Sequence, residues 1–248
     1  MVSGRSEKAS GKIRLGMVGG GQGAFIGAVH RIASRIDGMY EFVAGALSSD
    51  PERSRASGRE LGLREDRCYG SYEEMARREA QLKDGSEAVA IVTPNHVHFP
   101  AARAFLQRGI HVICDKPLTT TLRDAKKLAA LVEKSGKVFA VTHTYIGYPM
   151  VRQAREMVQN GELGEIRVIN VRYVQDWLTS RIEDSGHKQA EWRTDPARSG
   201  AGGAVGAWFA DVAFYMLGYF AYLAPVALIL GGVVALAPAA RGDRTNRS

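Results

Sequence analysis

The sequence predicts an α/β protein built on a doubly wound parallel sheet. Short apolar runs alternate with amphipathic segments over residues 12–142, and polar clusters follow the runs. The run 88–93 (AVAIVT) is typical of a parallel strand buried on both faces. Ligands bind beyond the carboxyl ends of such strands, so we expect the clusters GGGQG, SSD, TPNHVH, DKP and HTY to converge on one crevice.

The first unit, residues 13–30 (IRLGMVGGGQGAFIGAVH), has the pattern of a strand, a glycine-rich turn and a helix. We assign Gly19 to the tight turn, Gly21 to close approach by a pyrophosphate, and Ala24 to close packing of helix on strand. The first N–H groups of the helix and its dipole would hold the anion. The alternative is a glycine-rich connection that binds nothing. The dinucleotide-binding residues predicted here are Gly19, Gly21, Gln22, Ala24 and Phe25.

The second predicted strand, residues 41–47 (EFVAGAL), bears on the choice of coenzyme. Asp50 is predicted to be the N-cap of the next helix, which begins with a proline. Ser48 stands where a carboxylate would bind the adenosine ribose, and Arg53 is close enough in sequence to attract a 2′-phosphate. The pattern favours NADP without excluding NAD, and it makes Ser48, Ser49 and Arg53 candidate cofactor residues.

Further elements continue the alternation. We expect helices at 69–79, 99–108 and 123–135, and strands at 88–93, 110–114 and 138–142. Lys116 follows a strand and precedes Pro117, so its ammonium could be held at the crevice mouth. There it could donate to a substrate hydroxyl and the nicotinamide ribose and ease proton transfer as hydride leaves. The alternative is a surface lysine at a strand end.

The histidines allow several interpretations. His96 and His98 have a spacing compatible with a metal site, but no third ligand lies nearby, so no metal is expected. His98 is expected to cap the following helix or to line the cofactor cleft, and Asn95 to reach the cofactor through its amide. His143 and Tyr145 end the last strand and either face substrate or serve the structure.

Composition excludes some classes of function. The chain has 248 residues and a net charge of +7, yet its arginines are scattered and form no basic stripe, so we expect no nucleic-acid partner. Cys68 and Cys114 form no CxxC motif, which is typical of the reducing cytoplasm. Residues 1–11 are polar, are expected to be disordered, and show no secretory signal. These features predict a cytoplasmic protein.

The series GMVGGGQGAFIG, AIVTPNHVH, CDKPL, GELGEIRVI and EWRTDPARSGAGGA, within residues 12–205, resembles the Gfo/Idh/MocA oxidoreductases. The resemblance implies a Rossmann domain that binds NAD or NADP, over 12–142, followed by an α+β domain that binds substrate and often forms the dimer contact. It also implies hydride transfer to or from a sugar, polyol or inositol-like alcohol, with Lys116 as a catalytic residue. The residues bordering the cofactor at the strand ends are then Thr93, Pro94, Asn95, His98, Asp115, Lys116 and Pro117, and the substrate residues are His143, Tyr145, Lys188, Trp192 and Arg193.

The chain departs from the family pattern at several places. Asp115 replaces the more common glutamate, and Thr144 stands where the family has asparagine. After SGAGGAVG the family continues with D-I-G-x-H, whereas this chain reads AWFAD at 207–211, without that aspartate and histidine. We therefore expect a truncated α+β domain at 143–205 and a family-type homo-oligomer to be doubtful.

The end of the sequence is apolar. Residues 212–240 carry no charge and exceed the roughly 20 residues that span a bilayer. Residues 205–222 resemble the membrane-anchor region of septal DNA translocases of the FtsK type, so 206–240 is expected to be an apolar helix in contact with a membrane, and 241–248 a basic tail. A buried core helix is the alternative. One hypothesis is a chimeric or frameshifted chain joined near Gly206, which would leave a catalytically inactive nucleotide-binding fragment.

Overall fold

The computed structural model describes residues 11–168 and 195–199. Of these, residues 11–142 and 195–199 belong to one compact unit and residues 143–168 to a second. The second unit contains the 3-10 helix η2 (Thr144–Gly147) and helix α6 (Pro149–Gln159). The predicted second domain is described only up to residue 168 and at 195–199, and the apolar segment 206–240 lies outside the described residues.

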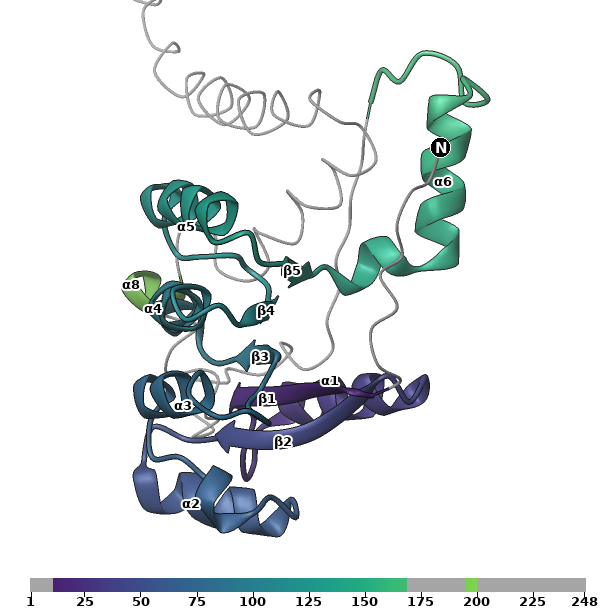
Figure 1. Ribbon diagram of the computed structural model, residues 1–248. Coiled ribbons are helices and arrows are strands. Elements are labelled where there is room, and N and C mark those ends of the chain that lie inside the picture. Colours follow the sequence, from purple (N-terminus) through teal and green to yellow (C-terminus); the bar gives the residue numbers. More distant parts are fainter. Residues whose placement is uncertain (1–10, 169–194, 200–248) are drawn as a thin grey trace, which may run out of the picture. The chain divides into compact units, whose positions relative to one another are not determined.

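The first unit is built on a parallel sheet of five strands in the order β2-β1-β3-β4-β5 (Figure 1). The chain starts in β1, moves to β2 at one edge, and then runs from β3 through β4 to β5 in the other direction. The order therefore reverses between β1 and β3, where open α/β sheets bind ligands. The strands are β1 (Ile13–Gly19), β2 (Tyr40–Ala46), β3 (Ala88–Val92), β4 (His111–Asp115) and β5 (Phe139–Thr142).

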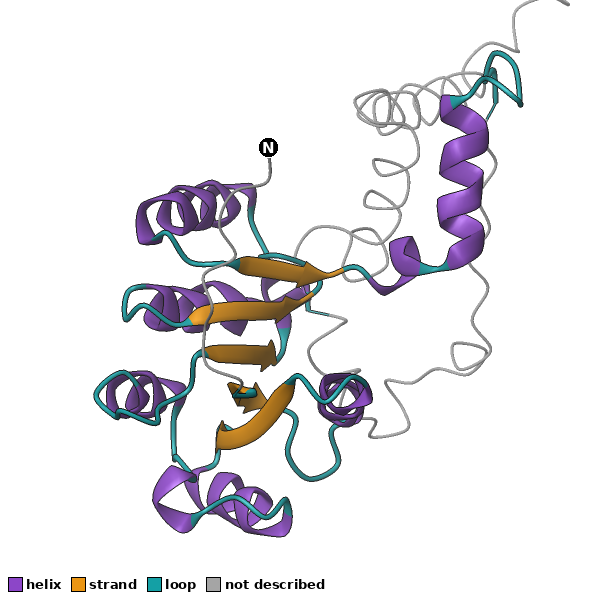
Figure 2. Cartoon of the chain, turned by 45° about the vertical axis from the view of Figure 1, so that its right-hand side comes forward, coloured by secondary structure: helices purple, strands orange, loops and turns teal. Residues whose placement is uncertain are grey.

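Helices cover both faces of this sheet, which confirms the predicted doubly wound fold. Helices α3, α4 and α5 lie on one face and α1 on the opposite face, while α2 lies beyond the β2 edge (Figures 1 and 2). The helices are α1 (Phe25–Ile36), α2 (Pro51–Glu60), α3 (Tyr72–Glu79), α4 (Asn95–Leu106), α5 (Leu122–Ser135) and the short α8 (Pro196–Ser199), with a 3-10 turn η1 (Glu65–Arg67).

Strand β3 lies at the centre of the core, and all five of its residues are buried. Val89 and Ile91 pack in the cluster that contains Phe105 of α4. The alternate residues, including Ala90, belong to a second cluster with Met17 of β1. Because successive side chains of a strand point to opposite faces, the uniformly apolar sequence of β3 fills both layers. This confirms the sequence interpretation of that run.

Two helix boundaries follow the predicted capping chemistry. The Asp50 carboxylate accepts a hydrogen bond from the Arg53 N–H at 2.7 Å, and α2 begins at the proline that follows Asp50. Helix α5 ends at Gly136, whose φ of +63° is a left-handed conformation that glycine adopts without a Cβ clash. Local sequence therefore specifies these ends.

The start of α4 was predicted wrongly. We expected the helix from about residue 99, but it begins at Asn95, directly after Pro94. The polar letters NHVH suggested a loop. In the structure Pro94 has the φ of −57° to which its ring restricts it and lies at the N-cap, and Val97 packs against the core cluster under the helix. Tertiary burial of Val97 and His98 outweighs the loop-like composition.

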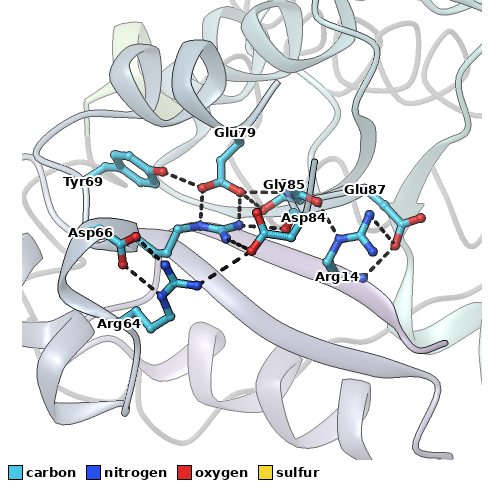
Figure 3. A network of polar contacts seen from close by, with 10 residues as sticks. Arg14, Arg64, Asp66, Tyr69, Glu79, Asp84, Gly85 and Glu87 are labelled. Atoms are coloured by element: carbon cyan, nitrogen blue, oxygen red, sulfur yellow. Dashed lines mark hydrogen bonds and ion pairs between the residues drawn. The ribbon is translucent and has the colours of Figure 1, made fainter. Parts of the chain in front are cut away.

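A buried polar network joins η1, α3 and the segment before β3 (Figure 3). Arg67 and Glu79 are 3% and 1% exposed, and Arg67 Nε donates to Glu79 Oε1 at 2.7 Å. The Tyr69 hydroxyl donates to the same carboxylate oxygen at 2.5 Å, and Ser86 donates both its N–H and its hydroxyl to the other oxygen at 2.8 Å. Burial raises the pKa of the Tyr69 hydroxyl, and the hydrogen bond to the Glu79 carboxylate is the second, smaller cause. The carboxylate is thus surrounded by donors.

The membrane expectation finds no support in the described part of the chain. No helix among residues 11–168 and 195–199 combines the length and the apolar character needed to cross a bilayer.

In the second unit, the rings of Tyr145 and Tyr148 pack edge to face, with centroids 5.7 Å apart and an interplanar angle of 67°.

Candidate functional site

The glycine-rich turn between β1 and α1 leaves no space for side chains. Gly19 and Gly20 have φ values of +80° and +78°, in the left-handed region. A Cβ on Gly19 would lie 2.9 Å from the Val92 carbonyl oxygen of β3. A Cβ on Gly21 would lie 2.7 Å from the Leu47 carbonyl oxygen, in the loop after β2. The backbone therefore forms a bare cradle at the point where the strand order reverses.

The close contact between helix and turn falls on a different residue from the one predicted. Ala24 is the exposed N-cap of α1, whereas Gly27 is buried. A Cβ on Gly27 would collide with the Cα of Gly20. The assignment of close packing to Ala24 is therefore wrong, because the turn is longer than the usual fingerprint and Gly27, one helical turn later, takes the role of its third glycine.

The turn exposes a defined set of amide groups. The N–H of Gly21 donates to the Leu47 carbonyl at 3.1 Å, and the N–H of Gln22 donates to Ser57 Oγ at 3.1 Å. Within the described residues the N–H of Gly23 has no partner, and the first N–H groups of α1 have none within the helix. Helix α1 also has no side-chain cap and no acidic residue in its first turn. These donors and the helix dipole favour an anion.

The loop after β2 lies beside this turn. Arg53 Nη2 donates to the Gln22 carbonyl at 2.8 Å, and the Arg53 side chain is exposed. The Ser48 hydroxyl accepts from the Asp50 N–H at 3.2 Å, and Ser49 is exposed. The structure thus brings the candidates of the first two loops together at one edge of the sheet.

The loop after β3 contributes a polar group without a partner. Thr93 lies against Gly19, and its buried Oγ1 makes no hydrogen bond in the described residues. Buried hydroxyls are usually hydrogen-bonded, so this oxygen is suited to a ligand. Pro94 is the N-cap of α4. Asn95, in contrast, is 2% exposed and donates its amide nitrogen to the Ser199 carbonyl at 2.8 Å. One N–H of this amide therefore connects α4 to α8.

His98 also differs from expectation. It neither caps a helix nor lines a cleft: it lies inside α4, fully buried. Its Nδ1 is 2.7 Å from the Pro117 carbonyl and its Nε2 is 3.0 Å from the Thr93 carbonyl, which leaves neither nitrogen for a ligand. A neutral imidazole donates from one nitrogen only, so one of these two contacts is a hydrogen bond in either tautomer. Burial lowers the pKa of His98, and the two carbonyls offset part of that effect. His98 thus connects the ends of β3 and β4.

The end of β4 carries the proposed catalytic lysine. Asp115 Oδ1 accepts from the Thr142 hydroxyl of β5 at 2.9 Å. Lys116 is partly exposed after the last residue of β4, and the peptide that joins it to the buried Pro117 is cis. Burial lowers the pKa of His30 in α1, and the negative charge of Asp115 offsets part of that effect.

The structure describes only two of the five predicted substrate residues. His143 and Tyr145 belong to the second unit, and Lys188, Trp192 and Arg193 lie outside the described residues. The sequence analysis missed the buried small face of α2. This face consists of Ser54, Ser57 and Gly58. These small residues are three and four positions apart in the sequence, a spacing that could have revealed the buried face.

The fold and this site define a dinucleotide-binding domain of the Rossmann type. The sequence pattern described as "Oxidoreductase family, NAD-binding Rossmann fold" matches residues 13–143, and that of the GFO/IDH/MocA C-terminal domain matches residues 151–225. The chain therefore belongs to the GFO/IDH/MocA family of oxidoreductases. The second match extends past residue 205 and includes 205–222, so the likeness of that segment to septal DNA translocases gains no support.

Individual relatives agree with this assignment. An uncharacterized oxidoreductase, YfiI, of Bacillus subtilis is 39% identical over 195 residues, which are 78% of this chain and 50% of that protein. The crystal structure of an oxidoreductase from Sinorhizobium meliloti is 66% identical, with a TM-score of 0.64, over 68% of this chain and 47% of that one. An inositol dehydrogenase homolog from Azotobacter vinelandii, solved with NAD+, is 37% identical, with a TM-score of 0.79, over 88% and 56%. The chain spans about half the length of these relatives.

Proposed function

We propose that this chain binds a nicotinamide dinucleotide at the glycine-rich turn and serves hydride transfer to or from a sugar, polyol or inositol-like alcohol. The observation that carries the proposal is the bare backbone cradle at Gly19 and Gly21, beside the uncapped start of α1. The unpaired Thr93 hydroxyl and the membership in an NAD-binding oxidoreductase family support it. The Azotobacter relative supports the substrate class.

Lys116 is proposed as the catalytic residue. Its position at the carboxyl end of β4 would allow its side-chain nitrogen to accept the substrate hydroxyl proton in the oxidation and to give a proton to the carbonyl oxygen in the reduction. When bound, the nicotinamide ring supplies the hydride acceptor or donor. His143 and Tyr145 are proposed to contact the substrate, together with Lys188, Trp192 and Arg193.

We further propose a preference for NADP. Ser48 leaves the end of β2 without the carboxylate that would repel a 2′-phosphate. The exposed guanidinium of Arg53, held beside the turn by the Gln22 carbonyl, is a suitable partner for that phosphate. NAD is the alternative, because a relative of known structure holds NAD+.

Titration with NADPH and NADH, followed by fluorescence, tests coenzyme binding and preference. We expect both to bind, NADPH more tightly, and the Arg53→Ala variant to lose about tenfold more affinity for NADPH than for NADH. Arg55→Ala, which removes a neighbouring arginine paired with Glu52, is the matched control and should change neither. Equal losses for both coenzymes in the Arg53 variant would exclude the 2′-phosphate contact.

A panel of polyols and sugars tests the reaction. The Lys116→Met variant should lose about 10²- to 10⁴-fold in turnover, as expected for removal of a general acid or base, while it still binds coenzyme. Wild-type protein that is folded but binds neither coenzyme would contradict the whole proposal. Unchanged turnover in the lysine variant would contradict the assigned role only.

A further inference from the structure

We infer that Arg31 is a positioning residue for coenzyme binding, because it binds the Gly20 carbonyl and keeps that oxygen from facing the pyrophosphate at the glycine-rich turn. The inference rests on the dinucleotide site proposed above. It adds a residue of α1 that neither the family pattern nor the sequence analysis assigned to the site.

The contact starts from within α1 and reaches back to the turn. Arg31 Nη1 donates to the Gly20 carbonyl oxygen at 2.8 Å. The same nitrogen lies 3.4 Å from the sulfur of Met17, a fully buried residue of β1. The side chain is half-buried, so the guanidinium is held between the strand and the turn and is less free than a fully exposed arginine.

The peptide between Gly20 and Gly21 is thereby held at both ends. Its oxygen accepts from Arg31 at 2.8 Å, and its N–H donates to the Leu47 carbonyl at 3.1 Å. The next peptide is held in the same way, since the Gly21 carbonyl accepts from the Ala24 N–H at 3.0 Å and the Gln22 N–H donates to a serine. A glycine-rich segment has low barriers to rotation, so these contacts define which way the peptides face.

The orientation matters electrostatically. A carbonyl oxygen turned toward the anion site would repel a pyrophosphate, whereas N–H groups attract it. Arg31 binds the Gly20 oxygen and brings a positive charge close to the turn. Burial lowers the pKa of this guanidinium, with repulsion from Arg35 as a smaller cause, but an arginine remains protonated in proteins. The charge and the orientation therefore act in the same direction.

Arg31 and Arg53 make parallel contacts with different expected consequences. Arg53 binds the Gln22 carbonyl from the first turn of α2, next to the loop that we assign to the adenosine ribose. A variant there should distinguish the two coenzymes. Arg31 acts on the turn that binds the pyrophosphate, which NADH, NADPH and ADP-ribose share, so its loss should weaken all three equally.

The test is the dissociation constant of NADH, NADPH and ADP-ribose for wild type, Arg31→Met and Arg31→Lys, measured by calorimetry. We expect Arg31→Met to weaken all three by a common factor of about ten, as for one charged hydrogen bond. Arg31→Lys keeps a cation and a donor and should recover most of the affinity. Arg35→Met is the control, because it removes an exposed arginine of the same helix that contacts the Arg31 carbonyl and not the turn.

The outcomes separate this inference from the proposed function. Wild type without affinity for any of the three ligands would overturn the proposed site itself. Binding by wild type with unchanged affinity in Arg31→Met would overturn the role of Arg31 alone. If Arg31→Met does not fold, Arg31→Gln, which removes the charge but keeps a donor, replaces it: a common loss of affinity for the three ligands in a folded protein supports the role, and unchanged affinity contradicts it.

Discussion

Two polar clusters of the first unit use arginine in opposite ways. Around Glu79, the carboxylate accepts from Arg67, from the Tyr69 hydroxyl and twice from Ser86, all in the buried interior. At the glycine-rich turn, arginines bind the carbonyl oxygens and leave N–H groups without partners in the described residues.

The difference separates stability from binding. In a buried network whose polar groups are paired with one another, no donor or acceptor is left for a ligand, so the network contributes to the stability of the folded state. The turn leaves N–H groups without partners among the described residues, and the Thr93 hydroxyl beside it is likewise unpaired there. We therefore expect substitutions in the first cluster to change the free energy of unfolding, and those in the second to change coenzyme affinity.

The largest effect is expected for Glu79→Ala. The substitution leaves the Arg67 guanidinium buried without its carboxylate, which typically lowers the free energy of unfolding by about 3–5 kcal/mol. Denaturation by urea measures it. Glu65→Ala is the control: Glu65 pairs with Arg59 at 3.3 Å on the surface, and its loss should lower the free energy of unfolding by less than about 1 kcal/mol. Similar values for both variants would contradict the distinction.

His98→Gln is expected to have a smaller effect, of about 1–3 kcal/mol, through the lost contacts to the Thr93 and Pro117 carbonyls. The pH dependence is diagnostic. The pKa of His98 is lowered in the folded state, so the unfolded state binds more protons below its own pKa of about 6.5. The contribution of His98 to the free energy of unfolding should therefore be constant above that pH and fall as the pH decreases toward the folded-state value, in a range where His30 and His96 also have lowered pKa values.

The glutamine variant should lose stability less steeply over that acidic range, because a glutamine side chain does not titrate. Urea denaturation at a series of pH values from 8 to 5 supplies the comparison. Parallel curves for wild type and variant would show that the buried imidazole does not contribute to the acid sensitivity.

The smallest effect is expected for Asp50→Ala. Loss of the cap on α2 should cost about 1 kcal/mol in the free energy of unfolding. Thr121→Ala, which removes the corresponding cap of α5, should cost a similar amount. NADH affinity should stay unchanged in both, since neither carboxylate nor hydroxyl contacts the turn. A selective loss of NADH binding in the Asp50 variant would instead place that residue in the site.

Much of the fold could be predicted because its causes are local. The apolar run of β3, the cap at Asp50 and the glycine at 136 each act through a few neighbouring residues. The convergence of strand-end loops follows from the topology. At the candidate site, these rules predicted the glycine-rich turn and Arg53, which lies beside it. Thr93 was predicted from the family resemblance.

The remaining features depend on tertiary contacts. Gly27 packs against Gly20 because the turn is longer than the usual fingerprint. The His98 ring points inward, where the carbonyls of Pro117 and Thr93 contact its two nitrogens. The reach of Arg31 to the Gly20 carbonyl depends on where α1 lies on the sheet. No sequence spacing specifies such a contact.

The most direct measurement compares NADH binding to wild type and to Gly21→Leu. A leucine there meets the Leu47 carbonyl and Ser57, so the turn must move. Gly11→Leu, which extends a side chain into open space, is the control. We predict that wild type and the control bind NADH alike, and that Gly21→Leu, with its circular dichroism retained, binds about 100-fold more weakly. Equal affinity in a folded Gly21→Leu protein would contradict the account.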